Sequence, residues 1–206
     1  MAQPGAGAAQ PENSAARPED SVAPASVAPD SAGQNSAAQN SAAQLAGSWT
    51  LDEARSEVRL KTRHTWGLLP LKGVFHQVSG RGTVTPDGAV TGVITVAAES
   101  VDTKNKRRDK HLRSADFFHV DNHPEFTFTV DSVTETGTNA RINGRLTVRG
   151  TTRPASFDAT VSRADGEVAL DGELPVNRTD FGLNWNFIGI ASAHSTIAVH
   201  AVFTRA

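Results

Sequence analysis

The chain has 206 residues, and its 20 Lys and Arg residues nearly balance its 22 Asp and Glu residues, giving a formal net charge of −2. This balance gives no global attraction to nucleic acid or acidic lipid. Cysteine and tyrosine are absent, which excludes disulfide frameworks, cysteine-ligated metals, thiol nucleophiles and tyrosine chemistry. The length predicts one domain with an extension, because it exceeds a typical domain and falls short of two.

Residues 1–44 differ in composition from the rest of the chain. They are mostly Ala, Ser, Gln, Pro, Asn and Gly, and their bulky apolar side chains are Met1, Val22 and Val27. Such a segment cannot bury enough apolar surface to offset the entropy lost on ordering, so we predict a disordered low-complexity tail. It also lacks the basic start and the apolar stretch of a secretory signal, and the expected location is therefore the cytoplasm.

From residue 45 to residue 206, apolar side chains recur with the period of two that is typical of β-strands. Clear runs are Val58, Leu60 and Thr62; Phe126, Phe128 and Val130; and Ile197, Val199, Ala201 and Phe203. Turn signals containing glycine separate the runs at residues 86–88, 135–137, 149–150 and 164–166. Many short strands at this spacing predict an all-β domain, either an antiparallel barrel or a sandwich.

Residues 105–118 depart from this pattern and predict a helix with a tight exit, capped by Asp102 or Thr103 and ended before Pro124. The stretch holds a basic run from Lys104 to Arg113, in which six of ten residues are Lys or Arg. Such a run is either a solvated helix face or a positive rim that makes transient contact with an anionic membrane surface. Nucleic-acid binding is not expected, because no aromatic residues are interleaved with the basic ones.

Two further motifs have structural interpretations. Trp49, in Gly47-Ser-Trp49, resembles the opening of a lipocalin and is expected to plug one end of a barrel with Arg205 stacked on it. His119 and His123 flank an aspartate in a pattern that a metal could use on a helix. Pro124 makes a helix there improbable, so we predict exposed loop histidines and no metal site.

Arg178 and Asp180 lie two apart in a predicted strand and are expected to form structural ion pairs with Arg108 or Asp109. Hydrolase, nucleotide-binding and dinucleotide-binding fingerprints are absent from the sequence. An acid–base role for these charged residues therefore has no accompanying nucleophile or phosphate loop.

Several segments, in order along residues 47–206, resemble the signature of the YceI-like family. The most specific are residues 108–118, Arg-Asp-Lys-His-Leu-Arg-Ser-Ala-Asp-Phe-Phe, and residues 144–154, Gly-Arg-Leu-Thr-Val-Arg-Gly-Thr-Thr-Arg-Pro. Further matches are residues 49–52, 63–64, 73–75, 100–103, 124–128 and 177–182. The sequence departs from the family pattern at His119 and His123, where Asp and Tyr are usual.

This resemblance implies an eight-stranded antiparallel lipocalin-like barrel with a short helical insertion. It also implies that the interior binds a long polyisoprenoid lipid, such as an isoprenoid quinone or a polyprenyl lipid, for carriage or storage. No cofactor and no catalytic reaction are implied, and a role in bacterial stress response is often proposed for the family. An eight-stranded barrel is just wide enough to be filled by side chains or to hold one slender ligand.

We expect the lipid to contact large apolar side chains that face the interior: Leu60, Trp66, Leu68, Leu69, Phe75, Ile94, Leu112, Phe117, Phe126, Phe128, Phe157, Leu183, Trp185 and Phe187. A polar set, Arg108, Asp109, His111, Arg178 and Asp180, is assigned first to structural pairing that fixes the insertion and second to the lipid head group.

Two alternatives stay open at this point. One is an enzyme acting on a small hydrophobic or lipid substrate, with Asp109, His111 or Asp180 as the acid or base. The other is a barrel filled by side chains that serves as an interaction module. A homodimer formed through a strand edge or the insertion is compatible with either.

Overall fold

The computed structural model describes residues 44–64, 69–164, 166–184 and 191–206. Its helical elements are α2 (Lys106–Arg113) and the 3₁₀ turns η1 (Ala98–Ser100) and η2 (Arg178–Phe181). Its strands are β1 (Gly47–Leu51), β2 (Glu57–His64), β3 (Leu69–Phe75), β4 (Val78–Val84), β5 (Val90–Ala97), β6 (Val101–Asp102), β7 (Glu125–Thr136), β8 (Asn139–Val148), β9 (Thr151–Ala164), β10 (Glu167–Asn177) and β11 (Ala191–Arg205).

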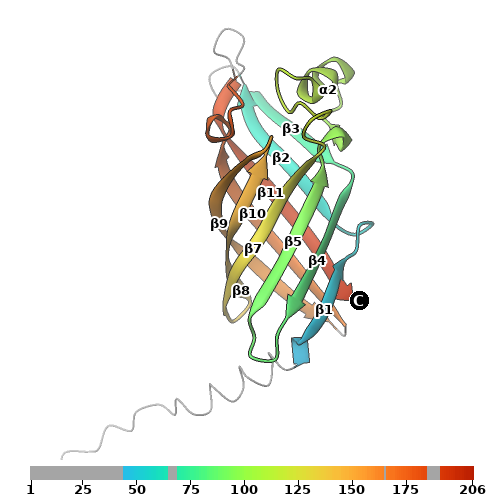
Figure 1. The fold of residues 1–206 in the computed structure, drawn as a ribbon, viewed down its shortest axis with the longest axis vertical. Coiled ribbons are helices and arrows are strands. Elements are labelled where there is room, and N and C mark those ends of the chain that lie inside the picture. Colours follow the sequence, from blue (N-terminus) through green and yellow to red (C-terminus); the bar gives the residue numbers. More distant parts are fainter. Residues whose placement is uncertain (1–43, 65–68, 165, 185–190) are drawn as a thin grey trace, which may run out of the picture.

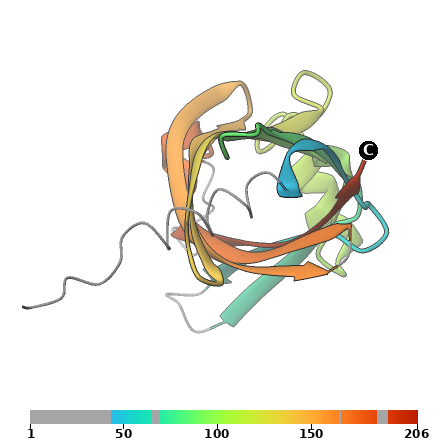
Figure 2. The ribbon, with the colours of Figure 1, turned by 90° about the horizontal axis from the view of Figure 1, so that it is seen from below.

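Eight of these strands form a closed antiparallel barrel. The order is β1-β4-β5-β7-β8-β9-β10-β11, and β11 returns to pair with β1. Seen from the β1 end, the strands form a ring (Figure 2). The fold expected from the sequence is therefore confirmed, with the sandwich alternative excluded.

The remaining strands lengthen the barrel at the end where α2 lies (Figure 1). β11 pairs with β1 from Trp49↔Arg205 to Leu51↔Phe203 and with β2 from Glu57↔His200 to His64↔Ala191. β1 and β2 therefore lie end to end along one long strand. β2 then pairs with β3, and β3 with the two-residue β6.

The chain between β6 and β7 carries α2 and covers this end of the barrel (Figure 1). The helix ends at Arg113, so the helix and its exit both lie within the expected residues 105–118, and its N-cap is Asn105. The Asn105 side chain accepts a hydrogen bond from the Arg108 amide (3.1 Å). The expected caps were wrong because Asp102 bonds instead to Lys104 and Thr103 bonds to Asp109.

The turn predictions hold at all four sites. Gly88, Gly137, Gly150 and Gly166 have φ between 62° and 87°, in the left-handed region that glycine enters without steric penalty. His119 and His123 lie in the loop before β7, as expected, but they are half-buried, with ring centroids 5.7 Å apart. Within the described residues, no group of three His, Asp or Glu side chains is placed to hold a metal.

The β1 end of the barrel is packed with side chains. Its interior holds Leu51, Ile142, Val161 and Ala201, each at most 4% exposed. The Trp49 indole closes this end, donates a hydrogen bond to the Leu45 carbonyl (2.9 Å) and lies under the Arg205 guanidinium at 5.0 Å. This is the plug that the Gly-Ser-Trp motif predicted.

Among the described residues, no helix is long and apolar enough to span a bilayer.

Candidate functional site

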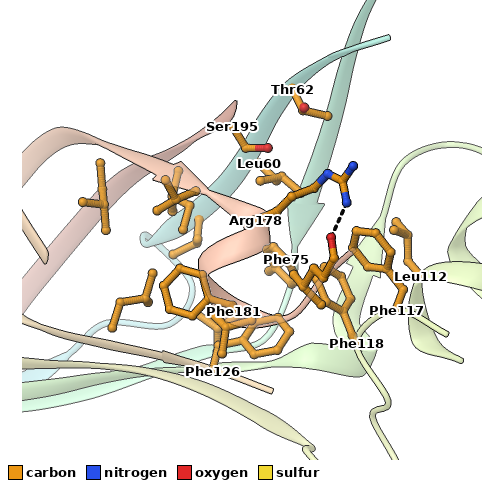
Figure 3. Close-up of a pocket in the computed structure, with 18 of the residues that line it drawn as sticks. Leu60, Thr62, Phe75, Leu112, Phe117, Phe118, Phe126, Arg178, Phe181 and Ser195 are labelled. Carbon is orange, nitrogen blue, oxygen red and sulfur yellow. Dashed lines mark hydrogen bonds between the residues drawn. The ribbon is translucent and has the colours of Figure 1, made fainter. Parts of the chain in front are cut away.

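The interior of the barrel at the α2 end encloses a cavity of about 500 Å³. Side chains from β2, β3, β5 and the strands from β7 to β11, together with others from α2 and η2, line it (Figure 3). Most of this lining is aliphatic or aromatic, and a volume of this size is typical of small-molecule sites. The alternative of a wholly filled barrel is therefore wrong for this half of the molecule.

Nine of the apolar residues expected at a lipid site line this cavity: Leu60, Phe75, Ile94, Leu112, Phe117, Phe126, Phe128, Phe157 and Leu183. Trp66, Leu68, Trp185 and Phe187 lie outside the described residues, as does the side chain of Leu69.

Sequence reasoning missed a second set of lining residues, although their signal was present. Val58, Val96, Leu146, Val148, Ile197 and Val199 occupy alternate positions on strands that the period-two pattern predicted. Leu71, Leu174 and Val176 also line the cavity, on β3 and on the later part of β10, where no run had been identified. The candidate lining residues were chosen for their large size, which favoured aromatic side chains. Choosing every inward-facing position of each strand would have included both the predicted residues and the missed ones.

Four phenyl rings join the insertion to the barrel wall. Phe118 follows α2 and contacts Phe126 of β7 at 4.9 Å between ring centroids and Phe75 of β3 at 6.3 Å. Phe117 contacts Phe118 at 4.9 Å. These rings lie where the chain passes from α2 to β7, so the insertion forms part of the cavity wall and its position determines the shape of the cavity.

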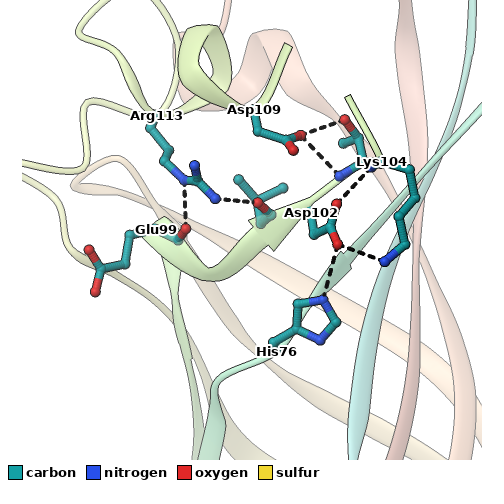
Figure 4. Close-up of polar contacts among 8 residues, drawn as sticks. His76, Glu99, Asp102, Lys104, Asp109 and Arg113 are labelled. Carbon is teal, nitrogen blue, oxygen red and sulfur yellow. Dashed lines mark hydrogen bonds and ion pairs between the residues drawn. The ribbon is translucent and has the colours of Figure 1, made fainter. Parts of the chain in front are cut away.

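Hydrogen bonds hold α2 to the end of β6 (Figure 4). The buried Asp109 carboxylate accepts from the Thr103 amide (2.9 Å) and the Thr103 hydroxyl (2.5 Å). Arg108 donates to the Thr103 hydroxyl and carbonyl, each at 2.7 Å. Arg113 donates to the carbonyls of Glu99 and Val101, each at 2.6 Å.

Arg108 and Asp109 therefore contact Thr103, whereas the expected ion pairs with Arg178 and Asp180 do not form. The reason is local: residues 178–181 form the 3₁₀ turn η2 and not a strand, so Arg178 and Asp180 face different directions. Asp180 is exposed and is not among the residues that line the cavity, while Arg178 is 8% exposed and does line it.

The Arg178 guanidinium donates hydrogen bonds to the main-chain carbonyls of Ser192 (3.0 Å) and Leu183. Burial lowers the pKa of Arg178 below its usual value, because removal from water disfavours the charged form. Figure 3 shows this side chain among Leu60, Phe75 and the other labelled lining residues.

A pair of phenyl rings lines the cavity next to the packed half, since Phe157 pairs with Ile142 across the sheet. Phe128 and Phe157 meet edge to face, with centroids 5.6 Å apart, and both line the cavity. Glycines on neighbouring strands make room for them: a Cβ on Gly144 would lie 2.8 Å from the Phe128 ring, and one on Gly172 would lie 2.8 Å from the Phe157 ring. We refer to Phe128 and Phe157 as the floor of the cavity.

Comparison with known proteins identifies a family model that matches most of the chain. The family model for the YceI-like domain matches residues 49–203. A UPF0312 protein of Staphylococcus aureus (strain N315) is 30% identical over 149 residues, which cover 68% of this chain and 84% of that protein.

Solved structures show the same fold. BcnA of Burkholderia cenocepacia superposes with a TM-score of 0.67 at 23% identity, covering 74% of this chain and 98% of that one. A polyisoprenoid-binding domain from Saccharophagus degradans, implicated in plant cell wall breakdown, superposes with a TM-score of 0.63 at 14% identity, covering 77% and 98%. The chain belongs to the YceI-like domain family.

Proposed function

We propose that the protein binds a long-chain polyisoprenoid lipid in its barrel and carries or stores it. The observation that carries this proposal is the cavity of about 500 Å³, whose walls are mostly aliphatic and aromatic and whose polar groups come mainly from α2, η2 and the start of β11. The Saccharophagus degradans neighbour, which is named for polyisoprenoid binding, supports the same class of ligand.

Apolar burial alone is sufficient for such binding. Each buried CH₂ contributes about 0.8 kcal/mol, so a five-carbon isoprene unit contributes roughly 3–4 kcal/mol before the losses of association. Those losses are on the order of 4–15 kcal/mol. A few buried units therefore bind firmly without a dense set of hydrogen bonds, which agrees with the sparse polar groups along the cavity walls.

A non-catalytic role fits the geometry better than an acid–base mechanism. Of the three candidate acid–base residues, only His111 lines the cavity. Asp109 is buried against Thr103, and Asp180 is exposed outside the cavity. A general acid and base must both reach the same reacting group, and these three residues do not converge on one point.

Two substitutions at adjacent positions of β5 test the proposal. Ile94 lines the cavity, whereas Thr95 lies on the other face of the same strand and is not part of the lining. Ile94→Trp fills the cavity, and Thr95→Trp adds the same indole outside it. Binding of an added isoprenoid quinone is measured by co-elution with each lipid-free variant in gel filtration, after circular dichroism has shown that the variant is folded.

We expect Thr95→Trp to bind like the wild type and folded Ile94→Trp to lose at least nine-tenths of the binding. Full binding by folded Ile94→Trp would place the ligand outside the barrel and contradict the proposal.

A further inference from the structure

One part of the barrel wall lacks a continuous ladder of backbone hydrogen bonds. The register between β2 and β11 shifts between Ala191 and Ser195, where three residues of β11 stand opposite Arg63 alone. On its other side, β11 pairs with β10 up to the end of that strand at Asn177. Within the described residues, residues 192–193 therefore have a strand partner neither on β2 nor on β10. We refer to this bulge of β11 and the facing end of β2 as the seam.

Side-chain hydrogen bonds hold the main chain of the seam. The Thr62 hydroxyl donates to the His194 carbonyl at 3.3 Å, and the Arg178 guanidinium donates to the Ser192 carbonyl at 3.0 Å. The His194 amide donates to the Ser192 hydroxyl at 3.1 Å. Segments with few ladder hydrogen bonds and little buried apolar contact open locally at lower free energy than paired core strands. The seam is therefore a place where the wall can part without unfolding the barrel.

The cavity and an outer groove meet at the seam. The groove has a volume of about 580 Å³, and Lys61, Lys72 and Pro175 belong to its lining. Lys61 faces outward, because it alternates with the cavity-lining residues on either side of it. Five residues line both the groove and the cavity: Thr62, Leu71, Val176, Ser192 and Ser195. Thr62 and Ser195 are opposite each other across the two strands (Figure 3). The same side chains therefore separate the interior of the barrel from the groove.

The insertion closes its end of the cavity more firmly than the seam closes the wall. Phe118 is 4% exposed and packs on Phe75 and Phe126, and the buried Asp109 carboxylate ties α2 to Thr103. Displacing the insertion would disrupt this buried packing. By contrast, the hydroxyl side chains of the seam are small and half-buried, so little apolar contact is lost when they move apart.

We propose that the lipid enters and leaves the cavity sideways through the seam, and that the outer groove is the site where it first binds. This inference rests on the proposed lipid-binding function and adds the route by which the cavity is filled. Leu71 and Val176, which line both spaces, give a prenyl tail an apolar path through the wall. The two ends of the barrel keep their closures, Trp49 at one end and the insertion at the other.

Two engineered disulfides compare the seam with the insertion, in a chain that has no cysteine of its own. Thr62→Cys with Ser195→Cys joins β2 to β11 at the seam, and Val74→Cys with Asp102→Cys joins β3 to β6 at the start of the insertion. Opposite residues of antiparallel strands have Cα atoms about 4.5–5.5 Å apart, which a disulfide can span. Each full-length variant is loaded with a ubiquinone of four isoprene units while reduced, and half of it is then oxidised. Transfer of the quinone to excess phosphatidylcholine vesicles is timed for both halves, after thiol titration has shown that the bond is formed.

We expect oxidation of the seam pair to slow release of the quinone at least tenfold and dithiothreitol to restore the rate. Oxidation of the β3–β6 pair should change the rate by less than twofold. Unchanged release from the oxidised seam pair, or equal slowing by the β3–β6 pair, would overturn the route and leave lipid binding intact. A wild-type protein that takes up no quinone would overturn the proposed function, and the route with it.

A matched pair of substitutions on β11 tests the groove without engineered bonds. Thr196 and Ala198 both face outward, because they flank the cavity-lining Ile197, but only Thr196 lines the groove. We expect Thr196→Trp to slow release at least threefold with the equilibrium affinity for the quinone within twofold of the wild type. Ala198→Trp should change neither quantity by more than twofold. Equal release rates for the two folded variants would exclude the groove from the route and contradict the inference.

Discussion

The two halves of the barrel share the same strand architecture but have different interiors. In the half that contains β1, the ring closes by strand pairing, and Leu51, Ile142 and Val161 fill it. In the half that contains α2, a cavity of about 500 Å³ remains. Since β6 pairs only with β3 among the described strands, an insertion and not a strand covers the barrel there.

This difference between the halves explains how one small barrel can be stable and still have room for a ligand. An eight-stranded ring closed by hydrogen bonds is just wide enough for side chains to fill. At the α2 end, α2 and the phenyl rings that follow it take the place of a strand in the wall. Side-chain contacts hold this segment, whereas backbone hydrogen bonds between paired strands hold the rest of the wall. We infer that the packed half supplies most of the stability and that the hollow half supplies the site.

The largest expected effect tests the packing of the two halves. Leu51→Ala removes a side chain that is 3% exposed in the packed half and should lower the free energy of unfolding by about 2–5 kcal/mol. Leu60→Ala removes a half-buried side chain that already faces the cavity, so its loss should lie at or below the low end of that range. Urea unfolding of the lipid-free proteins measures both values, and a larger loss for Leu60→Ala would contradict the comparison.

The second effect concerns the floor between the two halves. Phe128→Ala should extend the cavity and allow about one more isoprene unit to enter, with roughly 3 kcal/mol of additional apolar burial. Mass spectrometry of the copurified lipid should therefore show a shift toward longer tails. Val168→Ala is the control, because Val168 packs against the core and does not line the cavity. An unchanged tail-length distribution in Phe128→Ala would show that the floor does not limit the ligand.

The third effect concerns the attachment of the insertion. Asp109→Ala leaves the buried Thr103 amide without its acceptor, which should cost about 1–3 kcal/mol. Hydrogen exchange should accelerate first in α2 and β6 and leave the amides of β8 and β9 protected. The exposed Asp116 provides the control, and Asp116→Ala should leave exchange unchanged. Uniform acceleration across the barrel would show that the two halves unfold as one unit.

The smallest effect concerns the plug of the packed half. Arg205→Ala removes a guanidinium stacked 5.0 Å from the centre of the Trp49 ring and should lower stability by about 0.5–1 kcal/mol. Arg163→Ala removes an exposed ion pair with Glu135. Exposed ion pairs usually contribute less to the free energy of unfolding than this stacked contact is expected to contribute. Thermal unfolding of both variants compares them. A larger shift for Arg163→Ala would count against the stacking.

The strands and about half of the apolar cavity wall were predicted, because a period of two fixes which side chains share a face of the sheet. Val58, Ile197 and Val199 were recognised as members of alternating strand runs, yet their part in the cavity was not predicted, because alternation gives the inward positions but does not show where along them a barrel is hollow. That depends on how the ring closes, and the pairing of β11 with both β1 and β2 is a long-range property.

The polar contacts were less predictable than the strands. The assignment of Arg178 and Asp180 to a common strand face failed because the chain turns at residues 178–181. The partner of Asp109 was missed because Thr103 is a neutral residue, and charge patterns favour charged partners. Satisfying a buried carboxylate with a main-chain amide depends on the local path of the backbone, which residue types alone do not determine.

The most direct test of the central claim, that the hollow half holds a lipid, is solvent extraction of the purified full-length protein followed by mass spectrometry. The protein should be produced in a host that makes both isoprenoid quinones and polyprenyl phosphates. We predict about one isoprenoid molecule per chain. A folded preparation that yields no isoprenoid, while retaining an empty cavity, would contradict the account.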